Sequence, residues 1–139
     1  MENKKAGTFI PDTIALVIYG LPLGYLVFFL EKEVLQFTKY QWLMTHIIYL
    51  LHYPAGRLCA KLDDFFRQYF GLAIAGALAL CFYSTPIYMA GAIIAGVAWQ
   101  QVLLGCLIQV VINTCFGWLY GLILEFTRRA FDYFKQQNK

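Results

Sequence analysis

The sequence predicts an all-α membrane protein, a single domain of four transmembrane helices, and three observations carry that prediction. Of its 139 residues, 60% are hydrophobic and only 14% are charged, whereas about 25% of residues are charged in a typical soluble domain. The charges are also segregated, because no Asp, Glu, Lys or Arg occurs from Gln68 to Leu124. Finally, apolar stretches recur at roughly the 20 residues that a helix needs to cross a bilayer core of about 30 Å.

The first predicted helix covers residues 13–30. It begins after Asp12, which suits either an N-cap or an ion pair, and it ends at Glu31-Lys32-Glu33. Its apolar stretch exceeds the roughly 7–15 residues of a signal-peptide core, and no cleavage site of small residues follows it. We therefore expect this helix to be retained in the membrane.

The second predicted helix, residues 42–58, is the weakest of the four because polar residues and helix breakers interrupt it. His46 and His52 lie about 240° apart around such a helix, so they cannot bind one metal ion together. Either histidine could act as a proton relay, since an ionisable group inside a membrane is a functional candidate, or it could be a neutral packed side chain.

The third and fourth predicted helices cover residues 70–94 and 101–124. Only a few residues around 96–100 join them, which predicts a tight antiparallel hairpin. The remaining residues, 126–139, resemble a short amphipathic extension on the membrane surface, with aromatic side chains at headgroup depth. These aromatic residues are Phe126, Phe131, Tyr133 and Phe134.

The distribution of positive charge predicts the orientation. With four spans, all of the 11 Lys and Arg residues except Lys32 and Lys39 lie on the side of the two termini. The positive-inside rule then places both termini in the cytoplasm. The net charge of +3 needs no nucleic-acid partner to explain it.

Small and polar residues recur at every fourth position of the last predicted helix. The row consists of Gln101, Gly105, Gln109, Asn113, Gly117, Gly121 and Glu125. Such a row winds slowly around a helix, and small residues along it let helix backbones approach closely. We therefore expect Gly117 and Gly121, like the similar pair Gly20 and Gly24, to form helix-packing or dimer contacts.

The amides of Gln109 and Asn113 admit two interpretations. They either bond across helices as packing contacts or line a polar path for a solute and an ion. The candidate residues of such a path are Gln109, Asn113, Tyr88, Tyr19, Asp12 and Glu125. Three prolines inside predicted spans, Pro22, Pro54 and Pro86, favour the path, because bent helices form the substrate sites of transporters and supply hinges.

The sequence offers no pattern for an enzyme, a metal site or a cofactor. The four cysteines contain no Cys-x-x-Cys pair. No nucleophile with its base, and no pair of carboxylates, falls at one depth of the predicted membrane helices. A small multidrug transporter is disfavoured because residues 13–30 contain no acid.

Several short motifs follow one another along nearly the whole chain. They are Asp12-Thr13, Tyr53-Pro54-Ala55-Gly56, Thr85-Pro86-Ile87-Tyr88, Gly96-Val97-Ala98-Trp99-Gln100-Gln101, Gly117-Trp118-Leu119-Tyr120-Gly121 and Glu125-Phe126-Thr127-Arg128-Arg129. In this order and at this spacing they resemble the bacterial L-alanine exporter family. That family tends to carry an Asn and a Glu further along the first helix and an Asp in the third, where residues 24–28 and 75–77 of this sequence have none.

The resemblance implies an inner-membrane exporter that expels L-alanine, or a similar small amino acid, using the proton motive force. It also implies self-association through Gly117 and Gly121. Four helices are too few to build two gates around a central site, so we expect a homo-oligomer, most simply a parallel dimer. The alternative is a membrane protein without selective transport, either a holin-like pore former or an assembly subunit.

Overall fold

The computed structural model describes residues 9–137, and every regular element in this range is helical. In chain order these elements are α1 (Phe9–Glu33), α2 (Lys39–Leu50), the short 3₁₀ helix η1 (Tyr53–Ala55), α3 (Gly56–Arg67), α4 (Leu72–Ile94) and α5 (Trp99–Gln137). The predicted all-α class is therefore confirmed for this part of the chain.

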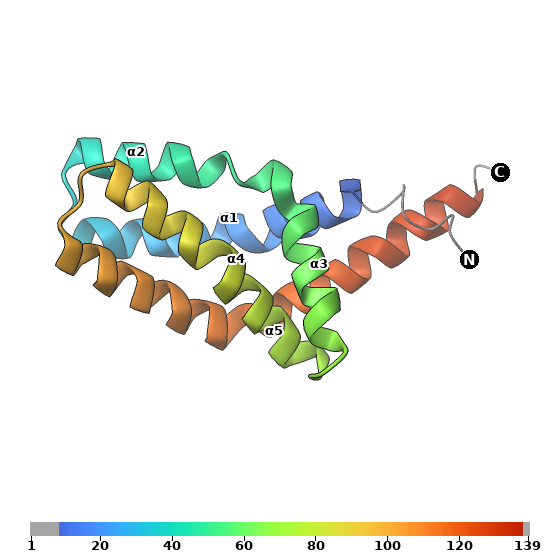
Figure 1. Cartoon of the computed structure of the whole chain (residues 1–139). Helices are drawn as coiled ribbons and strands as arrows, with labels where there is room; N and C mark the ends of the chain where they lie inside the picture. Colours follow the sequence, from blue (N-terminus) through green and yellow to red (C-terminus); the bar gives the residue numbers. More distant parts are fainter. Residues whose placement is uncertain (1–8, 138–139) are drawn as a thin grey trace.

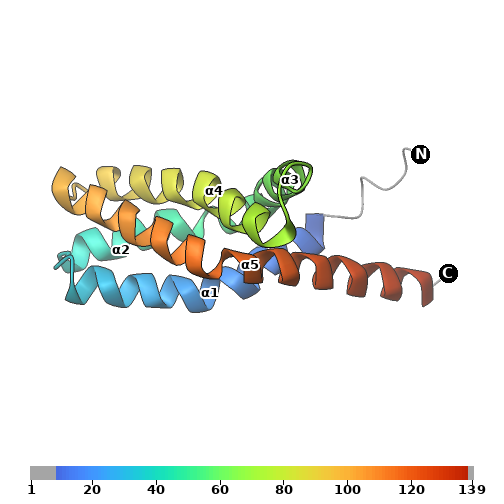
Figure 2. The same cartoon turned by 90° about the horizontal axis from the view of Figure 1, so that it is seen from below.

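Four of the helices run alongside one another as a bundle, and the fifth, α3, crosses the bundle near one end (Figure 1). Helix α4 packs against α2, α3 and α5, and α1 packs against α3 and α5. The start of α1 and the end of α5 lie at the end of the bundle where α3 crosses, and α5 continues well beyond the other helices (Figure 2). Successive helices of the bundle thus alternate in direction.

Three described helices, α1, α4 and α5, are long and apolar enough to cross a membrane. They contain the predicted spans 13–30, most of 70–94, and 101–124. Helix α2 has 12 residues, which gives a length of about 18 Å and falls short of a bilayer core. A fourth crossing by α2 together with η1 therefore stays a prediction.

The prediction of one continuous helix over residues 42–58 is wrong. Helix α2 ends at Leu50, and Pro54 lies in η1 before α3 begins at Gly56. Proline lacks the backbone N–H and its ring collides with the preceding turn, so the chain changes direction here. Helix α2 itself starts at a capping box. The Thr38 hydroxyl accepts from the Gln41 backbone N–H, and the Gln41 side-chain oxygen accepts from the Thr38 backbone N–H.

The predicted end of the last helix at residue 124 is also wrong, and the extension beyond it is not a separate element. Helix α5 runs without a break from Trp99 to Gln137. Residues 125–137 contain neither Gly nor Pro, and Glu125 pairs with Arg129 one turn later, which supports a continuous helix.

The predicted hairpin between the last two helices is present, with α4 and α5 joined by residues 95–98. Gly96 has φ +74°, a left-handed conformation that glycine adopts readily. The backbone N–H groups of Gly96 and Val97 donate to the carbonyls of Ile93 and Ala92. This pattern is a Schellman motif, which ends α4 sharply and turns the chain back along it.

Helices α4 and α5 approach very closely at a pair of glycines. A Cβ atom added at Gly117 would overlap the Ala77 backbone, and one added at Gly76 would overlap the Gly117 carbonyl oxygen. A Cβ at Gly121 would lie 3.0 Å from the Leu72 carbonyl oxygen. Gly117 and Gly121 therefore make their helix contacts within one chain, while a dimer contact at this pair stays a prediction.

We expect Gly117→Ala to destabilise the protein by about 1–3 kcal/mol, because the new methyl group forces two backbones apart. Alanine has the better helix propensity by about 1 kcal/mol, so a net loss would report the overlap itself. The measurement is the thermal unfolding midpoint in detergent. Gly71→Ala is the control, since nothing lies within 4 Å of a Cβ at Gly71; equal midpoints for the two variants would contradict the prediction.

Candidate functional site

Uncharged polar side chains meet in the interior of the bundle, between α1, α2, α4 and α5. We call Tyr19, Tyr49, Ser84, Gln109 and Asn113 the central polar cluster. The Asn113 Nδ2 atom donates to Ser84 Oγ at 2.9 Å, and the Tyr19 hydroxyl donates to Asn113 Oδ1 at 3.5 Å. The Gln109 Nε2 atom donates to the Tyr49 hydroxyl at 3.2 Å and to Ser84 Oγ at 3.4 Å.

The four-residue spacing on α5 explains how the cluster forms. Gly105, Gln109, Asn113, Gly117 and Gly121 are all buried on the face of α5 that packs against the other helices. Within the cluster, Gln109 is 3% exposed and Asn113 is 2% exposed. One acceptor there, Gln109 Oε1, is buried without a hydrogen-bond partner, which is unusual for a buried polar atom.

A cavity of about 10 Å³ lies beside the cluster, with Gly20 and Gly24 in its wall. This volume holds about one water molecule. A larger solute would fit there only if the helices separated, so the bundle is closed around the cluster in this structure.

A layer of buried apolar side chains separates the central polar cluster from the end of the bundle where α3 crosses. Its members include Leu16, Leu80, Tyr120 and Leu124. These side chains come from α1, α4 and α5, the same helices that supply most of the cluster. These buried side chains leave little room for water between the cluster and this end of the bundle.

Beyond the apolar layer, Arg128 joins three helices through two ion pairs. Its Nε atom donates to Asp12 Oδ1 of α1 at 2.7 Å, and its Nη1 and Nη2 atoms donate to the Asp64 carboxylate of α3 at 2.7 and 3.0 Å. We call these three residues the Arg128 network. The Asp12 side chain is 1% exposed, and the paired contact with Asp64 has the fork geometry that makes arginine pairs strong.

A second arginine fastens α3 to α5 at the same end. The Arg67 Nε atom lies 2.5 Å from Asp63 Oδ2, and its Nη2 atom donates to the Gly121 carbonyl oxygen at 2.9 Å. Glu125 lies 3.8 Å from Arg67 and also pairs with Arg129. Burial raises the pKa of the Asp63 carboxyl, and the neighbouring Arg67 opposes this shift.

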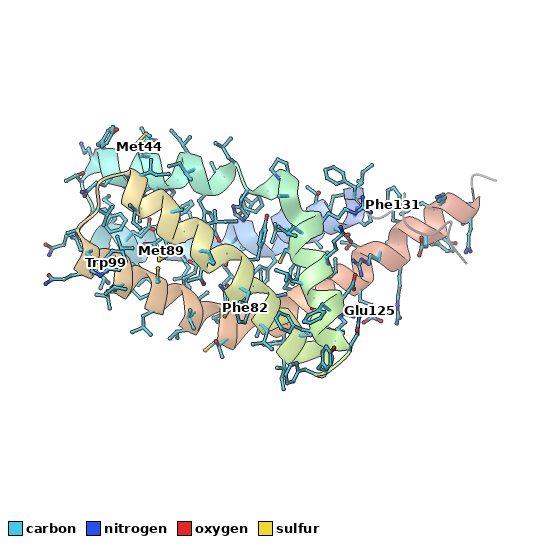
Figure 3. The ribbon with its side chains drawn as sticks, viewed as in Figure 1. Met44, Phe82, Met89, Trp99, Glu125 and Phe131 are labelled. Carbon is cyan, nitrogen blue, oxygen red and sulfur yellow. The ribbon has the colours of Figure 1, made fainter. Side chains whose placement is uncertain are left out.

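The predicted path residues occupy three different places. Tyr19 joins Gln109 and Asn113 in the central polar cluster. Tyr88 lies in a separate pocket around Glu31. The remaining two, Asp12 and Glu125, belong to the ion pairs at the end of the bundle, where Figure 3 shows Glu125 far from Trp99 at the start of α5.

The N-cap interpretation of Asp12 is wrong, because α1 begins at Phe9 and Asp12 lies in its first turn; the ion-pair alternative is correct. The candidate hinges also differ from one another. Pro22 and Pro86 lie inside unbroken helices, whereas Pro54 lies at the break between α2 and α3.

Sequence reasoning missed three residues of the interior, Ser84, Tyr49 and Glu31. The first two carry ordinary polar groups whose partners only the folded bundle reveals. Glu31 was interpreted as the charged end of a helix, yet it is 1% exposed. The buried face of α1 continues through Val27 to Glu31, four residues later, so extending the helical period by one turn would have placed Glu31 inside.

Comparison with known proteins identifies a family for this sequence. The model of the AlaE family, described as L-alanine exporter, matches residues 1–133. The L-alanine exporter AlaE of Escherichia coli (strain K12) is 28% identical over 65 residues, which cover 47% of this chain and 44% of that protein. The same identity and coverage are found for the L-alanine exporters AlaE of Escherichia coli O157:H7 and Shigella flexneri.

The aligned part thus spans a little under half the length of these curated relatives. No solved structure matches the chain. The family match, in contrast, covers nearly the whole sequence, including every predicted span and the residues of the central polar cluster. The chain belongs to the AlaE family of L-alanine exporters.

Proposed function

We propose that the protein exports L-alanine, or a similar small amino acid, across the inner membrane and that the proton motive force drives this export. The observation that carries the proposal is the central polar cluster, a set of buried hydrogen-bonding groups inside apolar helices. Such groups are placed at functional sites in membrane transporters, where discontinuous or closely packed helices surround a site near mid-membrane. The family match supports the same conclusion.

The chemistry of the cluster suits a small zwitterion. Its unpartnered acceptor, Gln109 Oε1, is available to an ammonium group. The Tyr19 hydroxyl can donate to a carboxylate once it releases Asn113 Oδ1, and the Asn113 Nδ2 atom can do so once it releases Ser84 Oγ. Gly20 and Gly24 present no side chain to the cavity. The Tyr53 side chain fills the space over Gly20, whereas a methyl group at the position of a Gly24 Cβ would have its nearest neighbours at 3.8 Å.

Export requires the closed bundle to open at each end in turn. At one end, the apolar layer and the Arg128 network must separate to admit the amino acid. Pro54, at the break between α2 and α3, is the hinge that we favour for this movement, with Pro22 and Pro86 allowing smaller bends in α1 and α4.

We place both termini in the cytoplasm and count α2 with η1 as the fourth crossing. The positive charges support this topology, since Arg57, Lys61, Arg67, Arg128 and Arg129 then share the cytoplasmic side. The expected partners are the lipid bilayer, the amino acid and a second copy of the chain in a parallel dimer. Because Gly117 already packs against α4, the second copy of the chain would have to contact the exposed side chains on either side of Gly117 rather than Gly117 itself.

The test uses purified protein in liposomes with an imposed pH gradient and labelled L-alanine. We expect gradient-dependent uptake that unlabelled L-alanine inhibits strongly and D-alanine weakly, with serine and leucine as further competitors. Passage of all these solutes without a gradient would favour the pore-forming alternative. No movement of any of them by folded protein would favour an assembly subunit.

A further inference from the structure

Glu31 is buried near the end of α1, at the opposite end of that helix from the Arg128 network. Its carboxyl group lies in a pocket formed by α1, α2 and α4. We call this the Glu31 pocket. The residues that line it are Val27, Phe28, Thr45, His46, Tyr49 and Tyr88, together with Glu31 itself.

The pocket contains no cation that would balance an ionised Glu31. The ionisable groups that face it are His46 and Tyr49 from α2 and Tyr88 from α4, while its neighbours on α1, Lys32 and Glu33, are exposed. Helix α5 contributes no charged residue to the pocket, and its nearest titratable group is Cys106, beside Tyr88.

No fully formed hydrogen bond stabilises a carboxylate here either. Neither the carboxyl oxygens of Glu31 nor the hydroxyls of Thr45 and Tyr88 make one, although the Tyr88 hydroxyl lies near enough to the Glu31 carboxyl group to interact with it. The His46 Nδ1 atom lies 3.6 Å from Glu31 Oε2 but 2.5 Å from the Trp42 carbonyl oxygen. The Nδ1 atom of His46 thus carries a proton, which it donates to that carbonyl. The Nε2 atom of His46 is buried without a hydrogen-bond partner, so a second proton there would be unsatisfied and the neutral form of His46 is favoured.

An ionised carboxylate without charged or hydrogen-bonded partners is very costly to bury, whereas a neutral carboxyl group is not. The closed pocket therefore suits the protonated form of Glu31. To lose its proton, the carboxyl group must first become accessible to water. Protonation and closure of this part of the bundle are consequently linked.

The size of the pocket limits what else could bind. It leaves no room even for a water molecule, so neither a hydrated cation nor the ammonium group of an amino acid can reach the carboxyl in this conformation. No cluster of metal-binding side chains occurs among the described residues. A proton is the one cation that needs no additional space.

Two tyrosines connect the Glu31 pocket to the central polar cluster. Tyr49 lines both the pocket and the cavity beside the cluster, and its hydroxyl accepts from Gln109. Tyr88 packs against Gly105, one turn before Gln109 on α5. A change of charge at Glu31 would therefore be felt directly by residues that touch the proposed amino-acid site.

We propose that Glu31 binds and releases the proton that is exchanged for the exported amino acid, which makes the Glu31 pocket the coupling site. The carboxylate takes up a proton when its end of the bundle is open, and the bundle closes around the neutral carboxyl group. When the opposite end opens and the amino acid enters, water reaches the Glu31 pocket past Tyr49, which lines both the pocket and the cavity beside the cluster, and the proton leaves by this route. This inference rests on the proposed export function.

The test compares two transport modes in the same liposomes. One is gradient-driven accumulation of labelled L-alanine, and the other is exchange of labelled for unlabelled L-alanine without a gradient. We expect Glu31→Gln to lower accumulation roughly tenfold or more relative to exchange, because the amide cannot carry a proton. Glu33→Gln is the matched control, an exposed carboxyl two residues away on the same helix, and it should change neither mode.

The inference would be overturned if Glu31→Gln had the same ratio of accumulation to exchange as the unsubstituted protein. That result would leave the export function intact. Absence of both modes in the unsubstituted protein would instead overturn the export function. If Glu31→Gln does not fold, a second measurement decides. Unsubstituted protein in weakly buffered detergent should release protons when L-alanine is added, and Glu31→Asp should shift the pH dependence of this release; binding without release at any pH would refute the coupling role.

Discussion

Replacing Arg128 by glutamine should destabilise the protein by about 3 kcal/mol, the lower end of the roughly 3–5 kcal/mol that breaking a buried ion pair costs. The reason is that Asp12, with 1% of its side chain exposed, would lose the cation that compensates its charge. The lower end applies because 25% of the Arg128 side chain is itself exposed. The measurement is the free energy of unfolding, or the thermal midpoint, in detergent.

Arg129→Gln is the matched control for this substitution. Arg129 is the next residue, and 78% of its side chain is exposed in its pair with Glu125, so its loss should cost no more than about 1 kcal/mol. The double variant Asp12→Asn with Arg128→Gln should recover part of the lost stability, since the carboxylate that it leaves without Arg128, that of Asp64, is 47% exposed rather than buried. If Arg128→Gln and Arg129→Gln lowered the free energy of unfolding equally, Arg128 would not be what stabilises the buried charge of Asp12.

Replacing Gln109 and Asn113 together by leucine should lower the rate of L-alanine transport by a factor of at least about 100. Each hydrogen bond to a charged group contributes about 1.5–3 kcal/mol, and the proposed site would lose two such bonds. The measurement is uptake of labelled L-alanine into liposomes, with the amount of folded protein determined by its elution as a single species.

Thr114→Leu provides the control, because Thr114 follows Asn113 directly but is exposed on the outer face of α5. We expect it to transport at nearly the unsubstituted rate. Unimpaired transport by the Gln109 and Asn113 double variant would remove the central polar cluster from the substrate path. The two amides would then serve helix packing, the other interpretation of the sequence pattern.

The helical class and most of the bundle could be predicted because hydropathy alone decides which segments leave water. The row from Gly105 to Gly121 likewise predicted which face of α5 is buried, since its members share one ridge of the helix. The break at Pro54 was harder to place. Pro54 and Gly56 indicate an interruption, but the sequence does not show where the helix ends or that α3 then crosses the bundle (Figure 1).

The candidate site could be predicted where one helix carries it, and not where several helices must meet. Gln109 and Asn113 were visible in the sequence as a local pattern. Their partners, Ser84 on α4 and Tyr49 on α2, lie at least 25 residues away along the chain. Glu31 was missed for a different reason: an acid beside Lys32 and Glu33 marks a helix end by composition. The helical period through Val27 indicates that Glu31 is buried, but it does not reveal that His46 and Tyr88 pack around it.

The continuity of α5 has a mechanical consequence. This helix has 39 residues and is therefore about 58 Å long, and it contains no proline, unlike α1 and α4. It carries Gln109 and Asn113 on one side of its tight contact at Gly117 and Arg128 on the other. A stiff rod held at an intermediate point behaves as a lever with a fulcrum. Swinging Arg128 away from Asp12 about Gly117 would press the opposite arm of α5 towards its neighbours, so opening one end of the bundle would tend to seal the other.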